Sequence, residues 1–89
     1  MVIKMEKNFS FSLKQRETEN LGEFFDKVQN SLSRRGLDLS IREVSHIFEV
    51  VDGPRGFYND YYSRYYSLQV SFSGNDTYHF FLRTYIFKN

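Results

Sequence analysis

Apolar and polar residues alternate along the first segment of the chain. Over residues 3–13 the odd positions are apolar except for Lys7, and the even positions are polar throughout. A period of two places successive side chains on opposite faces of a strand. The pattern therefore predicts a β-strand with one buried face and one solvated face.

A helical pattern follows this segment. Asn20 occupies an N-cap position, and Glu23 follows three residues later, which is the spacing of a capping box. Gly36 suits the left-handed position of a Schellman motif, with Leu37 packing back on the last turn. We expect a helix over about residues 21–35, whose apolar residues recur at helical spacing: Leu21, Phe24, Phe25, Val28 and Leu32.

Residues 39–51 favour a second strand, because they are rich in β-branched side chains and end at a turn-forming Asp-Gly-Pro sequence. Their alternation is poor. The residues Ile41 and Ile47 lie on one predicted face, whereas Val44 and Phe48 lie on the other with Val50. Apolar residues on both faces indicate a central strand, or a bulge that switches the faces midway.

Two long segments flank residues 73–76 and predict a β-hairpin. A two-residue loop at Gly74 and Asn75 would mix polar and apolar groups on each face. An odd loop centred on Asn75 instead makes one face almost wholly apolar. Because a slip of one residue exchanges the two faces, the pattern favours the odd loop, of three or five residues. The resulting pairs are Phe72 with Tyr78, Val70 with Phe80, Leu68 with Leu82, and Tyr66 with Thr84.

The densest aromatic cluster spans residues 57–66 and follows a run of turn-forming residues. We expect a loop over residues 52–60 and a strand from about Tyr61, because tyrosine and serine favour strands slightly more than helices. The tyrosines also recur with i, i+3, i+4, i+7 spacing. A short helix over residues 57–66 is therefore the alternative.

Together these elements predict a single α+β domain over residues 1–89. The order is β-α-β-β-β, which gives a two-layer fold: an antiparallel sheet of about four strands with one helix packed across one face. Odd positions of the last two strands then face away from the helix. A solvated sheet face is normally polar, but this one is predicted to be aromatic, with Tyr61, Tyr65, Phe81, Tyr85 and Phe87.

Composition narrows the class of protein. The chain has no cysteine, which excludes disulfides, thiolate metal ligands and cysteine nucleophiles. Its formal net charge of +1 is too small to produce the strong positive field of a dedicated nucleic-acid-binding domain. The N-terminus lacks the apolar core of a signal peptide, and no apolar stretch approaches the roughly 18 residues of a membrane span. We expect a cytoplasmic protein with no membrane association.

No set of catalytic or metal-binding residues emerges from the motifs. His46 and His79 are the only histidines, whereas a structural zinc site normally has four ligands at recognisable spacing. Serine, histidine and aspartate all occur, but without the local motif of a nucleophile elbow. The glycines at 53 and 56 lack the spacing of a P-loop. We therefore expect neither an enzyme nor a bound metal or cofactor.

The aromatic cluster and its neighbouring arginines are the candidate binding residues, because tyrosine and arginine dominate binding hot spots. The predicted set is Arg55, Tyr58, Tyr61, Arg64, Tyr65, Phe81, Arg83 and Tyr85. The opposing interpretation is that these aromatics fill the core or coat the sheet, and that nothing binds to them.

Three functions compete. The first is a small protein-binding module, an inhibitor or adaptor of the kind that phages and mobile elements encode, which uses the outer sheet face and the loop over residues 52–60. The second is a single-stranded RNA- or DNA-binding domain that stacks bases on sheet aromatics, against which the low net charge counts. The third is a homodimer that buries the aromatic face, since large exposed apolar patches mark contact sites.

Overall fold

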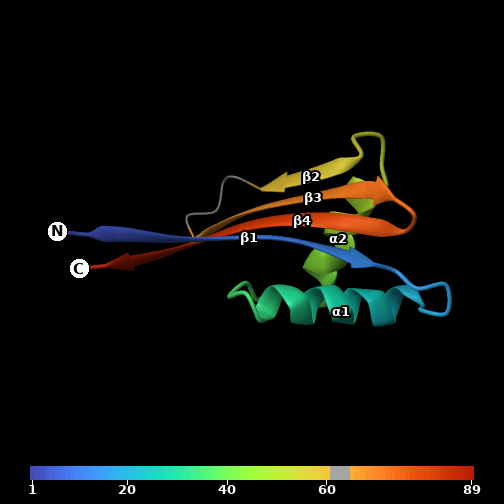
Figure 1. Ribbon diagram of the computed structural model, residues 1–89, viewed down its shortest axis with the longest axis horizontal. Coiled ribbons are helices and arrows are strands. Elements are labelled where there is room, and N and C mark those ends of the chain that lie inside the picture. Colours follow the sequence, from blue (N-terminus) through green and yellow to red (C-terminus); the bar gives the residue numbers. More distant parts are fainter. Residues whose placement is uncertain (61–64) are drawn as a thin grey trace.

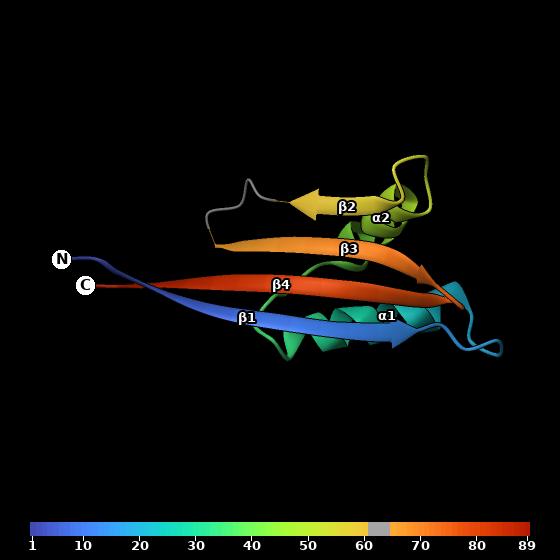
Figure 2. The ribbon, with the colours of Figure 1, turned by 45° about the horizontal axis from the view of Figure 1, so that its top comes forward.

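A four-stranded antiparallel sheet with two helices on one face makes up the part of the chain that the computed structural model describes, residues 1–60 and 65–89. The strand order across the sheet is β1-β4-β3-β2 (Figure 1). Figure 2 shows the sheet in front and both helices behind it. The elements are β1 (Ile3–Lys14), α1 (Leu21–Ser33), α2 (Ile41–Val51), β2 (Phe57–Asp60), β3 (Tyr66–Gly74) and β4 (Thr77–Lys88).

The α+β class and the antiparallel sheet are confirmed, but the predicted order is wrong in one element. The observed order is β-α-α-β-β-β, with two helices instead of one. Strand β1 forms as predicted and pairs with β4 along its whole length. Both strands project past the end of α1, and the molecule is accordingly 50 Å long but only 25 Å and 21 Å in its other dimensions (Figure 1).

Helix α1 begins and ends as its capping residues predict. The Asn20 side-chain oxygen accepts a hydrogen bond from the backbone N–H of Glu23 at 2.8 Å. At the other end, the N–H of Leu37 donates to the carbonyl of Leu32 at 3.0 Å, and Gly36 has a φ of +95°. These are the features of a Schellman motif. The apolar stripe of α1 lies buried against the sheet through Phe24, Val28 and Leu32.

Residues 41–51 form helix α2, so the predicted second strand over residues 39–51 is wrong. A full capping box starts this helix: the Ser40 hydroxyl accepts from the Glu43 N–H, and the Glu43 carboxylate accepts from the Ser40 N–H, each at 3.1 Å. The four buried residues recur at helical spacing: Val44, Ile47, Phe48 and Val51. Burial of this stripe outweighs the modest preference of β-branched residues for strands.

The β3–β4 hairpin has the predicted register, with Leu68 opposite Leu82 and Val70 opposite Phe80. The predicted loop of three or five residues is wrong, because two residues join the strands and the odd spacing arises from a bulge between Phe72 and Gly74. The turn itself is a tight one at residues 75 and 76, where φ is 52° and 55°. Positive φ at both central residues is what a type I′ turn requires.

Residues 57–60 form strand β2, which pairs with β3 at the edge of the sheet. This corrects both the loop predicted over residues 52–60 and the helix considered over residues 57–66. The strand predicted from Tyr61 falls partly outside the described residues, which resume at Tyr65. Strand β3 then begins at Tyr66.

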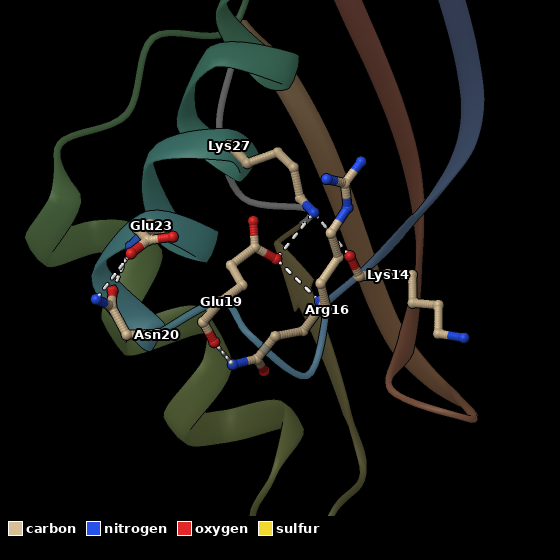
Figure 3. A network of polar contacts seen from close by, with 7 residues as sticks. Lys14, Arg16, Glu19, Asn20, Glu23 and Lys27 are labelled. Atoms are coloured by element: carbon tan, nitrogen blue, oxygen red, sulfur yellow. Dashed lines mark hydrogen bonds and ion pairs between the residues drawn. The ribbon is translucent and has the colours of Figure 1, made fainter.

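The turn between β1 and α1 is held by a network of polar contacts around Glu19 (Figure 3). Its carboxylate accepts from the backbone N–H of Arg16 and from the Lys27 ammonium, each at 3.0 Å. Lys27 also donates to the carbonyl of Lys14 at 2.7 Å. One carboxylate and one ammonium thus join the end of β1 to the first turns of α1.

The core lies between the sheet and the two helices. Aromatic rings dominate its centre: Phe48 packs edge-on against Tyr78 with 4.8 Å between ring centroids, and Phe11 stacks on Phe80 at 5.0 Å. Among the described residues, neither helix is long and apolar enough to cross a membrane.

Candidate functional site: the outer face of the sheet

Among the described elements, none covers the face of the sheet that points away from both helices (Figure 2). Strand β4 runs through its middle, between β1 and β3. Even positions of β4 are buried beneath the helices, as at Tyr78, Phe80 and Leu82. Odd positions therefore form a central row on the outer face, and this row consists of Thr77, His79, Phe81, Arg83, Tyr85 and Phe87.

His79 is held between two serines of the neighbouring strand. The Ser10 hydroxyl lies 3.1 Å from Nε2 of His79, and the Ser12 hydroxyl lies 2.9 Å from Nδ1. In a neutral imidazole one ring nitrogen donates and the other accepts, and each serine hydroxyl can serve either role. Both ring nitrogens are therefore engaged, and the ring is oriented on the sheet surface.

Arg83 is fixed in the same way further along the face. Its Nε donates to the side-chain oxygen of Asn8 at 3.0 Å and lies 3.6 Å from the carboxylate of Glu6. The guanidinium carbon lies 5.9 Å from the ring centroid of Phe81, within reach of a cation–π contact. Glu6 offsets much of the positive charge that Arg83 brings to this face.

Tyr85 lies further along the same row. The ammonium of Lys4 lies 4.0 Å from the centroid of the Tyr85 ring, which is a close cation–π geometry. Across the other side of β4, strand β3 contributes small uncharged polar side chains: Ser67, Gln69 and Ser71. The aromatic rings of Phe81 and Tyr85 thus lie between polar strands instead of joining one continuous aromatic surface.

This arrangement is suited to binding. Its polar side chains are held by hydrogen bonds to one another, so little rotamer freedom remains to be lost when a partner docks. Half-exposed Phe81 and Tyr85 offer rigid contact area, and the hydroxyl and amide groups around them offer hydrogen bonds. Within the described residues, no three His, Cys, Asp or Glu side chains gather closely enough to hold a metal ion.

The structure brings together three of the predicted binding residues, namely Phe81, Arg83 and Tyr85. Arg55 lies exposed in the turn between α2 and β2. Tyr65 lies beside Tyr85, whose backbone N–H donates to the Tyr65 carbonyl at 3.0 Å, and both residues line a cavity at the end of α1. The predicted residues Tyr61 and Arg64 lie outside the described part of the chain.

Tyr58 lies on the opposite side of the sheet from Phe81. It faces α2 across a cavity of about 330 Å³, which is lined by Leu39, Arg42, Glu43, His46, Ile47, Tyr58, Asp60 and Tyr66. The Tyr66 hydroxyl donates to the Asp60 carboxylate at 3.1 Å. Burial, and then the charge of Asp60, raises the pKa of Tyr66 to about 12 and also raises the pKa of Tyr58. Both hydroxyls are therefore neutral donors at ordinary pH.

Sequence reasoning missed the β1 residues of this face. The alternation of residues 3–13 predicts only that Asn8, Ser10 and Ser12 lie on the solvated side of a strand. Their role depends on the β1–β4 register, which sets Ser12 opposite His79 and Asn8 opposite Arg83. The signal that could have found them was the run of small polar residues at alternate positions, since such residues are suited to cross-strand hydrogen bonds.

Comparisons of the chain with models of protein families, with curated proteins and with solved structures give no match. The interpretation of the outer face rests on its own geometry and chemistry.

Proposed function

We propose that this protein is a binding module, acting as an adaptor or inhibitor, that docks a protein partner on the outer face of its sheet. One observation carries the proposal: the half-exposed rings of Phe81 and Tyr85 lie in the middle of an uncovered face whose polar neighbours are already oriented. Aromatic anchors surrounded by hydroxyl and amide groups are typical of surfaces that recognise proteins.

The charge of this face favours a protein partner over a nucleic acid. Among the described residues of this face the cations are Lys4, Lys14 and Arg83, and Glu6 lies 3.6 Å from the Arg83 guanidinium. A strand of nucleic acid is held by rows of cations along its phosphates as well as by stacking on aromatic rings. The face offers rings for stacking but few free charges beside them.

Affinity capture with matched variants tests the proposal. The tagged protein, from the cells in which it occurs, is captured with and without nuclease, and the bound proteins are identified by mass spectrometry. We expect a stoichiometric partner that survives nuclease. The double substitution F81S/Y85S should abolish its recovery, because truncation of a central hot-spot residue typically costs 2 kcal/mol or more.

A control variant removes exposed apolar groups from the helical layer. Leu21 and Ile41 are 60% and 40% exposed, and each is the first residue of its helix. The variant L21S/I41S should capture the partner as well as the wild type does. Equal capture by F81S/Y85S would contradict the proposal, and recovery that nuclease abolishes would assign the face to nucleic acid instead.

A second candidate function, homodimerisation, is favoured by the projecting ends of β1 and β4. Here Ile3, Met5 and Ile86 are 52%, 46% and 45% exposed, and Met5 pairs directly with Ile86. Apolar residues gathered on one side of an edge ribbon suit a symmetric contact with a second copy. We expect sedimentation at high concentration to show a dimer that M5K disrupts. A monomeric mass at every concentration would exclude it.

A further inference from the structure

A basic cavity lies at the C-terminal end of α1, on the helical side of the sheet. Its volume is about 380 Å³, within the range of roughly 300–1,000 Å³ that is usual for small-molecule sites. Helix α1 ends beside the projecting strands β1 and β4 at this point (Figure 1). The lining residues are Lys7, Phe9, Arg34, Arg35, Gly36, Tyr65, Thr84, Tyr85 and Ile86.

The arginines of this cavity are positioned by the end of the helix. Arg35 donates from Nη1 to the carbonyl of Ser31 at 2.8 Å, and its guanidinium carbon lies 3.9 Å from the ring centroid of Phe11. Arg34 donates from Nε to the carbonyl of Asn30 at 3.4 Å. A guanidinium has five N–H donors, so each arginine retains donors for a further acceptor.

Among the described residues, the three cations that line the cavity have no carboxylate partner. No Asp or Glu is among the lining residues, and Lys7, Arg34 and Arg35 form no ion pair within the described part of the chain. Lys27 and Arg83, by contrast, each lie beside a carboxylate. The negative end of the helix dipole accounts for two arginines at this position, but not for the lysine on β1.

Lys7 is also the one residue that breaks the apolar pattern of the inner face of β1. It lies opposite Thr84, between the apolar positions Met5 and Phe9. A lysine at this position brings a third positive charge to a hollow that already has two. Uncompensated cations that converge on one cavity attract an anion, and arginine with lysine is the usual combination for phosphate.

Apart from Gly36 and Thr84, the rest of the lining is apolar or aromatic. Phe9 and Ile86 form the inner-face wall, and Tyr65, which is 64% exposed, stands at the edge of the cavity. A flat ring can pack on such groups while its charged end reaches the cations. We propose that this cavity binds a nucleoside phosphate, with the phosphate held by Lys7, Arg34 and Arg35 and the base against Phe9, Tyr65 and Ile86.

The experiment measures binding of AMP, GMP, CMP and UMP, each alone, and of inorganic phosphate, to the full chain by calorimetry at low salt. We expect at least one nucleotide to bind more tightly than phosphate. K7Q and R34Q should each weaken binding about tenfold, the equivalent of one lost charge-assisted hydrogen bond. R34K should weaken it less than R34Q, because it keeps the charge.

The control variants are R42Q and K88Q, which remove a cation elsewhere and should bind as the wild type does. Circular dichroism verifies that each variant is folded. The proposal is overturned if no nucleotide binds, if K7Q and R34Q bind as tightly as the controls, or if phosphate alone binds as tightly as every nucleotide.

An oligonucleotide with and without a 5′-phosphate distinguishes the source of the ligand. Tighter binding of the 5′-phosphorylated oligonucleotide than of any mononucleotide, with the same dependence on Lys7, assigns the cavity to a nucleic-acid terminus. Equal or weaker binding assigns it to free nucleotides. K7Q and R34Q test the cavity without altering the residues proposed for the outer face, whereas Tyr85 lines the cavity as well as that face.

Discussion

The hydroxyl of Tyr78 donates a hydrogen bond to the carboxylate of Asp52 at 3.1 Å. Tyr78 lies on the buried face of β4, whereas Asp52 caps the C-terminus of α2. The ring of Tyr78 meanwhile packs edge-on against Phe48 of the same helix. One tyrosine thus joins the middle of the sheet to α2 by both a polar and an apolar contact.

The substitution Tyr78→Phe should lower the free energy of unfolding by about 1 kcal/mol, because it removes the hydrogen bond and keeps the ring. Asp52 is exposed and stays hydrated, so no buried charge is left behind. Urea denaturation measures the loss. Tyr85→Phe is the control, since its hydroxyl makes no hydrogen bond within the described part of the chain. Equal stabilities for the two variants would show that the Asp52 contact contributes nothing.

Alkaline titration should show that Tyr66 and Tyr78 ionise late. Burial, and then the neighbouring aspartate, raises the pKa of Tyr66 and that of Tyr78 to about 12, from the ordinary value of 10.0. A raised pKa in the folded state contributes stability below pH 10 that is lost as the pH rises towards 12. We expect the free energy of unfolding to fall over this range.

Tyrosinate absorbance followed against pH measures these groups directly. Tyr66→Phe and Tyr78→Phe should each remove one late-ionising tyrosine from the wild-type titration. A single phase near pH 10 in the folded wild type would contradict the prediction.

The capping box of α2 is tested at Ser40. Ser40→Ala removes the acceptor for the Glu43 N–H and should cost about 1 kcal/mol. Ser40→Asp keeps an acceptor at the same position and should retain most of the stability. The comparison is made by urea denaturation. If alanine and aspartate behaved alike, α2 would not depend on a cap at residue 40.

Glu19 should make the stability of the fold depend on pH in the acid range. A hydrogen bond from the backbone N–H of Arg16, and then the contact with Lys27, lowers the pKa of this carboxyl from its ordinary value of 4.5. A lowered pKa contributes stability that is present above pH 4.5 and is lost as the pH falls through the folded-state value. Glu19→Gln should therefore melt below the wild type at neutral pH, with a gap that narrows in acid.

Glu17→Gln is the matched control for this prediction, because Glu17 is exposed in the same turn. Its melting temperature should follow the wild type across the pH range. A gap between Glu19→Gln and the wild type that stayed constant with pH would show that the ionised carboxylate is not what holds the turn.

The elements that the sequence predicted correctly are those with strong local signals. The β1 alternation, the Asn20 cap and the Gly36 terminus of α1 each depend on neighbours within a few residues. The hairpin register was also predictable, because only one alignment sets Leu68 opposite Leu82. The bulge that produces this register could not be read from the pattern, since a bulge and a longer loop shift the pairing equally.

Helix α2 was missed although its signals were present. Ser40 and Glu43 have capping-box spacing, and Val44, Ile47, Phe48 and Val51 lie on one helical face. The same residues are β-branched or aromatic, and such short apolar runs suit a strand as well as a helix. Packing against β2 and β3 decides between them, because burial of the stripe requires the helical period.

The sequence by itself determined the two-layer class, the apolar face of each strand and both ends of α1, because these follow from local spacing and capping chemistry. Tertiary structure decided which residues meet. Strand pairing set His79 between Ser10 and Ser12, and the end of α1 set Arg34 and Arg35 beside Lys7. These contacts join residues far apart in the chain, and no local pattern encodes them because they depend on register and on helix placement.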